Sequence, residues 1–418
     1  MYKQKVSFRN IFILLIVSLS FLQRVIVEKI PQFSYYDECV MAIFLVGFLG
    51  LIIKKHMIYK YDLKILCFIL ALIIVGLIGN MRSGYSRTMG TILSGTLVWF
   101  KAFIVYVSFD YILKNLNGSI QSTIRILHKV AKMFVIASFA CLVISPVTKY
   151  GIELSAARAR YGLHPFMFIY SQPALLSWYC LATMMILTIA NVNEIEMKCS
   201  NIKYRIILTV VWISTLRSRA FVFCLLYWLL YYAFFVFDRQ SIPRIKLRYI
   251  IIAGICTLVV ASGAIQKYFY SGETTRSILL TTGILIAIRF FPFGAGIANY
   301  ATSASFKNYS SLYYDYGFNM IYRLNKSTDG MTELTDCYWP AVMGEFGVIG
   351  TFIMIFLLVF IGKELIKRSR FNKWIYYNTL FFIVTSLFSS VATAVFSSDA
   401  MILYIIIVCL GVYSYRTE

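Results

Sequence analysis

The sequence has few charged residues for its length. Only 14% of its 418 residues are Asp, Glu, Lys or Arg, whereas soluble domains carry about 25%. Hydrophobic residues make up 60%, and the mean hydropathy is +0.75. Such a chain cannot cover a soluble globule with a polar surface, so we predict a polytopic membrane protein.

Two further absences narrow the fold class. The nine cysteines show no paired spacing, which predicts neither a disulfide framework nor a zinc site. Strands of a membrane barrel would alternate polar and apolar residues in segments of ~10 residues, and here the apolar runs are unbroken. The predicted fold is therefore all-α, with residues 1–418 forming one membrane domain built as a helical bundle.

The apolar runs predict about twelve transmembrane helices. The first is expected to be a retained span and not a cleaved signal. The seventh is short, and a broken or tilted span is tolerated only where protein or a wet cavity covers its backbone. The predicted spans lie near residues 9–27, 38–53, 64–79, 90–113, 133–147, 166–190, 204–216, 220–237, 249–265, 341–362, 374–396 and 400–415.

Basic residues lie in short clusters between these spans. Most of the 40 Lys and Arg residues fall on one side of the predicted bundle, and this is the pattern of cytoplasmic loops. Both termini are therefore expected in the cytoplasm. Because topology accounts for the clusters, the net charge of +22 does not predict a nucleic-acid partner.

The longest polar interval, residues 267–340, is predicted to be a large external loop. Such a loop has no spanning role, so we expect its residues to serve recognition or chemistry. Within it, residues 277–288 are apolar but too few to cross a bilayer. They predict a short helix at the membrane surface, ended by the turn that contains Pro292, Gly294 and Gly296.

The predicted outward-facing cations are mainly Arg. A planar guanidinium grips phosphate or carboxylate through two hydrogen bonds, whereas Lys acts as a point charge. These residues are candidates for one anion-binding pocket, although an arginine near a helix end is also a common interface anchor. The candidates are Arg158, Arg160, Arg217, Arg219, Arg276 and Arg289.

Two acids lie near the outer mouth of the tenth span. Either could act as a general base or hold an arginine; Asp336, nearer the polar loop, is favoured as the base, and Glu345 is better placed to hold an arginine. Tyr300 and Tyr338 are candidates for substrate contact, because aromatic rings suit the apolar faces of sugars, although Tyr also favours the bilayer interface.

Lys101 and Asp110 lie inside the fourth span. At nine residues apart they fall on opposite helix faces, so each needs a partner elsewhere.

Four elements, in this order, resemble the Wzy-type polysaccharide polymerases and the related O-antigen ligases. They are Arg160-x-Gly162 with Pro173, Ser214-Thr-Leu-Arg217-Ser-Arg219, Arg276 with Pro292-Phe-Gly294-Ala-Gly296-x-x-x-Tyr300, and Asp336-x-Tyr338 with Glu345-Phe-Gly347. The resemblance covers the second half of the chain and the loop at 158–173. Ligases of this family typically carry a His where this chain has Asp336 and Cys337.

The resemblance implies a metal-independent glycosyltransferase without a cofactor, on the outer face of a bacterial cytoplasmic membrane. A glycan would leave its polyprenyl-diphosphate carrier and join a hydroxyl of the next lipid-linked repeat unit. It implies Asp336, Arg217 and Arg276 as catalytic residues. A flippase and a chain-length regulator are the implied partner proteins. The alternative functions are an O-antigen ligase and a lipid-linked oligosaccharide flippase, although transporters usually consist of repeated halves, and none is visible here.

Overall fold

The computed structural model describes residues 8–115, 120–145, 154–156, 158–193, 198–237, 274–326 and 331–414. In these ranges the chain is helical and has no β-strand, only isolated bridges that join Ser155 to Phe166 and Arg160 to Leu163. The all-α prediction is confirmed. The predicted span at 249–265 lies outside the described residues.

Eight described helices are long and apolar enough to cross a membrane. They are α1 (Phe8–Val27), α2 (Tyr36–Lys55), α3 (Lys60–Ser83), α4 (Met89–Asn115), α5 (Gln121–Ile144), α8 (Ser218–Tyr231) with its π-helical continuation η3 (Tyr232–Phe237), α14 (Tyr338–Ser369) and α15 (Lys373–Ala392). Three shorter helices accompany them: α6 (Pro173–Ile189), α7 (Lys198–Ile213) and α16 (Asp399–Tyr413). The total of about twelve spans stays a prediction.

α5 and α6 begin farthest from the positions that the hydropathy predicted. α5 starts at Gln121, well before the predicted 133, because Ile124, Leu127 and Ala131 bury one face while basic residues occupy the other. α6 starts at Pro173 and not at 166, because Pro suits the first helical position and forces Gln172 before it into extended backbone.

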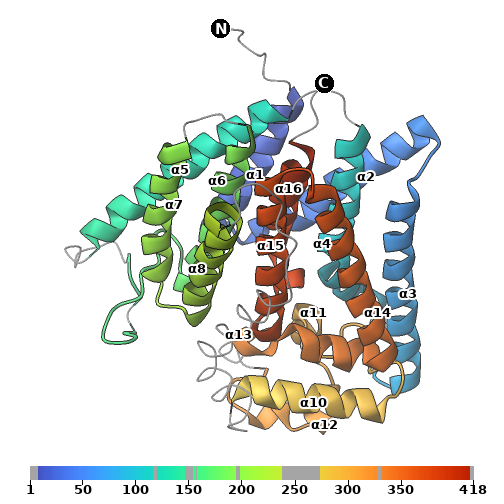
Figure 1. The fold of residues 1–418 in the computed structure, drawn as a ribbon. Helices are drawn as coiled ribbons and strands as arrows, with labels where there is room; N and C mark the ends of the chain where they lie inside the picture. The colour runs from blue at the N-terminus through green and yellow to red at the C-terminus, as the bar shows by residue number, and fades with distance from the viewer. Residues whose placement is uncertain are drawn as a thin grey trace.

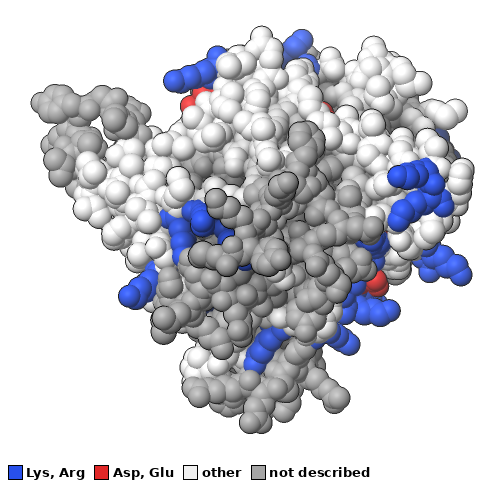
Figure 2. All heavy atoms as spheres, turned by 90° about the horizontal axis from the view of Figure 1, so that it is seen from above, with Lys and Arg blue, Asp and Glu red and all other residues white. Residues whose placement is uncertain are grey.

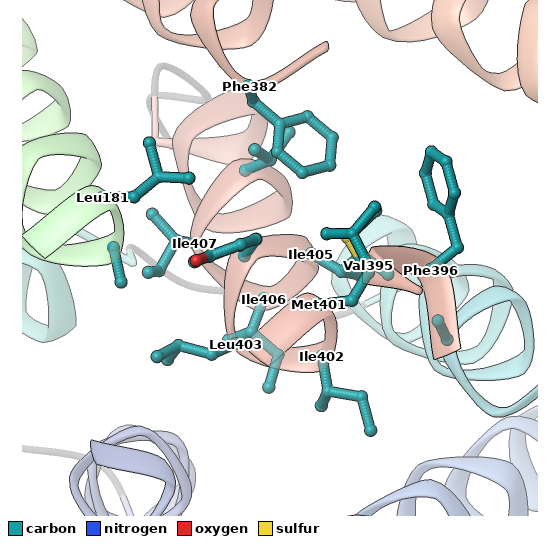
Figure 3. Packing of buried hydrophobic residues seen from close by; sticks show 14 of the residues in the cluster. Leu181, Phe382, Val395, Phe396, Met401, Ile402, Leu403, Ile405, Ile406 and Ile407 are labelled. Atoms are coloured by element: carbon teal, nitrogen blue, oxygen red, sulfur yellow. The ribbon is translucent and has the colours of Figure 1, made fainter. Parts of the chain in front are cut away.

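The short helix α16 forms the centre of the bundle. All of its residues from Met401 to Tyr413 are buried. Figure 3 shows Ile402, Leu403 and Ile407 of α16 among Leu181 of α6, Phe382 of α15 and the Val395–Phe396 turn. A helix that is apolar on all sides is expected only where neighbouring helices surround it.

Lys101 and Asp110 both find partners on other helices. Buried Lys101 hydrogen-bonds to Asp37 at the start of α2 and lies 3.6 Å from the Asp399 carboxylate at the start of α16. Asp110 accepts hydrogen bonds from Arg368 of α14 at 2.8 and 3.0 Å and pairs with Lys114 at 2.7 Å. The prediction that they are not partners of each other is confirmed. Each charge is buried with a counter-charge, as the low dielectric requires.

Four short helices lie at one end of the bundle. They are α10 (Thr275–Arg289), α11 (Ser303–Lys307), α12 (Leu312–Asp315) and α13 (Met331–Leu334). Figure 1 shows α10 lying across this end, crosswise to the long helices, while α1 begins and α16 ends at the opposite face. The helix predicted at 277–288 is therefore present as α10.

α14 is interrupted near this end of the bundle. Gly347 has φ 61° and ψ −157°, which separates residues 338–346 from residues 348–369. The Pro292–Gly296 turn supplies hydrogen bonds to carbonyls next to this break. Ala295 N–H donates to the Gly344 carbonyl at 2.8 Å, and Gly296 N–H donates to the Glu345 carbonyl at 2.9 Å. A broken helix in a membrane protein needs such partners for its free carbonyls.

Candidate functional site

The site is built around the first turn of α10. Thr274 caps the helix by accepting a hydrogen bond from the Ser277 N–H, which places Arg276 in the first turn. α10 lies so close to the beginning of α14 that a Cβ on Gly283 would be 2.8 Å from the Pro340 carbonyl oxygen. Held in this way, Arg276 donates from Nη2 to Oδ2 of Asp336 at 3.1 Å. The pair joins α10 to the segment that leads into α14.

Several charges act on the Asp336 carboxyl. Burial raises its pKa above the ordinary value, and the charge and hydrogen bond of Arg276 oppose that effect. Glu333 also raises the pKa of Asp336, and Arg219 lowers it. The Asp336 side chain keeps 37% of its surface exposed and Arg276 keeps 22%, so a ligand can still reach the pair.

Arg219 reaches the same region from α8. The chain turns sharply between α7 and α8 at Leu216, whose φ is 49°, and Arg217 is the N-cap residue of α8. Arg219 Nη2 donates to the Ala174 carbonyl at 2.9 Å, and its guanidinium lies over the Trp178 ring at 5.0 Å. The electrostatic field at Arg219 includes Arg217, Arg276 and Asp336. Arg276 and Asp336 are therefore in contact, Arg219 lies near enough for its charge to act on Asp336, and Arg217 is two residues before Arg219.

The loop before α6 is attached to this turn by its backbone. Phe166 N–H donates to the Ser214 carbonyl at 2.9 Å. Farther out, Arg160 and Leu163 exchange two backbone hydrogen bonds of 2.7 and 2.9 Å around Tyr161 and Gly162, both with positive φ.

Arg158 and Arg160 are exposed on this hairpin. The structure connects their loop to the Ser214–Arg219 turn but gives neither guanidinium a contact with Arg276 or Asp336.

Arg289 does not join the other arginines. It lies at the opposite end of α10 from Arg276, about 20 Å away at ~1.5 Å per residue. Its Nη1 is 3.9 Å from Oδ2 of Asp315, and its guanidinium lies over the Phe290 ring at 5.2 Å. The expectation of one pocket for six arginines therefore fails at Arg289, because the helix holds it out of reach.

Glu345 has a different role from the one predicted. Its carboxylate accepts hydrogen bonds from Trp99 Nε1 at 2.7 Å, the Tyr300 N–H at 3.0 Å and the Thr302 hydroxyl at 2.9 Å. Within the described residues no arginine forms an ion pair with Glu345, so the arginine-holding hypothesis is wrong there. Glu345 instead fastens the loop after α10 to α4 and α14.

Tyr300 and Tyr338 are both buried. Tyr300 donates its hydroxyl to the Leu279 carbonyl at 2.6 Å, and burial raises its pKa far above the usual range. The Tyr338 hydroxyl lies 3.2 Å from Sδ of Met354, and its ring packs on Trp99 and Phe396. In this conformation both side chains hold the loop against the bundle and present no surface to a substrate.

Sequence reasoning missed two contributors. Arg87, between α3 and α4, donates to Oδ1 of Asn299 at 2.9 Å and to the Asn308 carbonyl at 2.6 Å, and so holds the segment between α10 and α12. Trp178 supports the Arg219 guanidinium from α6. The predicted outward excess of arginine was a signal for Arg87, whereas nothing in the sequence paired Trp178 with Arg219.

The arrangement can bind an anion and accept a proton at the same place. Two guanidinium groups that come from different helices can each offer paired N–H donors to phosphate oxygens. The Asp336 carboxylate, in contact with Arg276, can take a proton from a bound hydroxyl. Among the residues described, no three His, Cys, Asp or Glu side chains are grouped closely enough to hold a metal ion.

Compared with known proteins, the sequence matches no protein-family model and no curated protein.

Proposed function

We propose that the protein is a membrane glycosyltransferase that polymerises polyprenyl-diphosphate-linked oligosaccharide repeat units into a surface polysaccharide. The observation that supports it most directly is the Arg276–Asp336 pair with Arg219 beside it, at the end of a membrane bundle. A lipid diphosphate presents its charge at this depth, where the bilayer ends. The proposal includes about twelve spans and an external loop at residues 267–340.

The proposed reaction uses the pair in two steps. The substrate diphosphate accepts two hydrogen bonds from the Arg276 guanidinium, which then no longer pairs with Asp336. The Asp336 carboxylate is thereby able to accept a proton. The acceptor hydroxyl oxygen then bonds to the anomeric carbon, the bond from that carbon to the diphosphate breaks, and the hydroxyl proton passes to Asp336. The diphosphate leaves on its lipid, with its added charge stabilised by Arg276, Arg219 and Arg217.

The distribution of basic residues indicates how the bundle is oriented in the membrane. Figure 2 shows the face at which α1 begins and α16 ends, with Lys and Arg side chains around it and few acidic ones. Positive residues favour the cytoplasmic side of a membrane protein. We therefore assign this face to the cytoplasm of a bacterial cell, and the opposite face, with α10 and the Arg276–Asp336 pair, to the outside.

Two alternative functions remain to be compared. An O-antigen ligase would use the same donor chemistry, but the residue before Cys337 is an acid and not a histidine. A flippase would be expected to bind its substrate near mid-membrane. The charges buried inside the described helices, such as Lys101 and Asp110, are each paired with a counter-charge on another helix, whereas the accessible arginines lie at the bundle end.

Deletion of the gene followed by analysis of cell glycans separates the three functions. Loss of long polymer with single repeat units still transferred to the surface supports the polymerase. Long polymer left unattached identifies a ligase, and lipid-linked units confined to the cytoplasmic leaflet identify a flippase. Complementation with Arg276→Lys, checked for normal membrane insertion, tests whether the lost activity depends on the proposed site.

A further inference from the structure

A second cluster of polar and aromatic side chains lies at the far end of α10. The Tyr85 hydroxyl, from the α3–α4 loop, hydrogen-bonds to the Asp315 carboxylate of α12. Arg289 of α10 lies 3.9 Å from the same carboxylate, and its guanidinium lies over the Tyr316 ring at 6.0 Å. The Phe290 ring lies beneath the guanidinium and meets the Tyr85 ring edge-on at 5.8 Å. We call these five residues the α10 C-terminal patch.

The patch is open to a ligand and contributes little to stability. The Arg289 and Asp315 side chains keep 54% and 46% of their surface exposed. An exposed ion pair at this separation typically contributes between nothing and about 1 kcal/mol. The hydrogen bond from Tyr85 instead fixes the position of the carboxylate, and the Phe290 and Tyr316 rings support the guanidinium, which keeps two planar polar groups side by side.

The composition of the patch selects against an anion. A phosphate placed on Arg289 would also meet the Asp315 carboxylate, and two like charges at close range repel. Vicinal hydroxyls suit both groups, because they accept from the guanidinium and donate to the carboxylate. The apolar face of a sugar ring can lie on an aromatic ring next to them. A carbohydrate therefore fits the patch better than a lipid phosphate does.

We propose that the α10 C-terminal patch binds the glycan portion of a substrate, several sugars away from the diphosphate held near Arg276. The proposal rests on the proposed function for the identity of the ligand. The separation of about 20 Å along α10 is too long for both ends to contact one diphosphate. This separation suits an extended oligosaccharide attached to that diphosphate, because the length of α10 fixes the distance between the two sites.

The test measures two affinities of the purified full-length protein in lipid nanodiscs. One probe is polyprenyl diphosphate without sugar. The other is carrier-free oligosaccharide, released by mild acid from the lipid-linked repeat units of the host. Asp315→Ala should lower the oligosaccharide affinity roughly tenfold or more, because it removes hydrogen bonds to a charged group, and should leave the polyprenyl-diphosphate affinity unchanged. Tyr316→Phe removes only a hydroxyl and should weaken the same affinity without affecting folding.

Lys326→Ala, at another exposed cation of the loop, is the matched control and should change neither affinity. Unchanged oligosaccharide binding in both Asp315→Ala and Tyr316→Phe would overturn the patch. Arg276→Lys should show the opposite pattern, with a lower affinity for polyprenyl diphosphate and an unchanged affinity for oligosaccharide. If both affinities are unchanged, the proposed diphosphate site is wrong, while the proposal for the α10 C-terminal patch still holds. Tighter binding of longer oligosaccharides indicates the growing chain, and equal binding of single units indicates the acceptor; either supports the patch.

Discussion

Arg276 and Asp336 are sixty residues apart in the sequence, yet Nη2 of one lies 3.1 Å from Oδ2 of the other. The contact exists because α10 lies across the end of the bundle against the beginning of α14. A guanidinium that is paired with a carboxylate before substrate arrives can exchange that partner for a phosphate. The pair thus links diphosphate binding to the release of a base.

The first prediction concerns the pH dependence of polymer formation. As a base, Asp336 works only when deprotonated, and burial raises its pKa above the ordinary value. Activity should therefore fall with decreasing pH at a higher pH than an exposed aspartate would give. Since bound diphosphate removes Arg276 from Asp336, the acid limb of kcat should lie above that of kcat/KM. Rates measured on purified lipid-linked repeat units provide both profiles.

Asp336→Asn should lower the rate of polymerisation by roughly 10²–10⁴-fold, as expected for a lost general base, and remove the acid limb. Glu333→Gln is the control: this acid is bound to Arg323 and Thr275, so the variant should keep the limb, moved to lower pH because Glu333 raises the pKa of Asp336. A fully active Asp336→Asn protein would remove Asp336 from the mechanism.

The second prediction tests whether the arginines act as more than positive charges. Lysine at position 160, 217 or 276 keeps the charge but loses the bidentate geometry, so each variant should fail to make long polymer while inserting normally. Arg323→Lys is the matched control, because Arg323 is exposed and paired with Glu333 at 2.8 Å. Polymer length is measured on gels of surface glycan. Wild-type polymer from all three variants would show that these arginines only anchor helices at the membrane interface.

The third prediction concerns Glu345. Glutamine there keeps the size but must turn an amide N–H₂ toward donors such as Trp99 Nε1 or the Tyr300 N–H. Leaving a buried donor unsatisfied costs roughly 1–3 kcal/mol. Glu345→Gln should therefore lower the thermal stability of the protein in detergent, while the polyprenyl-diphosphate affinity of the folded fraction stays at the wild-type value. A loss of affinity without loss of stability would contradict this structural role.

The fourth prediction concerns the close contact between the Pro292–Gly296 turn and the break in α14. A Cβ on Gly294 would be 2.8 Å from the Gly344 carbonyl oxygen, and one on Gly347 would be 2.5 Å from that of Pro292. Both glycines also have positive φ, which disfavours alanine. Gly294→Ala and Gly347→Ala should yield little monodisperse protein on size-exclusion chromatography. Gly50→Ala, which meets nothing within 4 Å in α2, should fold as well as wild type.

The fifth prediction concerns topology. Ser311 is exposed at the bundle end that carries α10, and Lys54 is exposed at the end of α2. In a background without the exposed Cys39 and Cys67, Ser311→Cys should react with an impermeant thiol reagent in intact cells. Lys54→Cys should react only after permeabilisation. The reverse pattern would place the proposed site in the cytoplasm and exclude polymerisation at the outer face.

The sequence alone determined the features that depend on local composition. Long apolar runs specify membrane helices because each must satisfy its own backbone hydrogen bonds in lipid, and α2, α3 and α4 lie where those runs predicted them. The short apolar stretch at 277–288 predicted α10 in the same way. The sequence also marks Asp336 and Arg276 as chemically suitable residues in a polar interval, although no local pattern shows that they meet.

Tertiary structure decided which of these residues meet, because a contact between distant segments depends on how the helices pack. Arg289 and Arg276 are held apart because they lie at opposite ends of the rigid helix α10. The Glu345 carboxylate accepts hydrogen bonds from Trp99, Tyr300 and Thr302 and forms no ion pair with an arginine among the described residues. Tertiary structure also paired Lys101 with α2 and α16, and Asp110 with α14. A buried charge in the sequence predicts that a partner exists. Its identity follows only from the packing of helices that lie far apart in the chain.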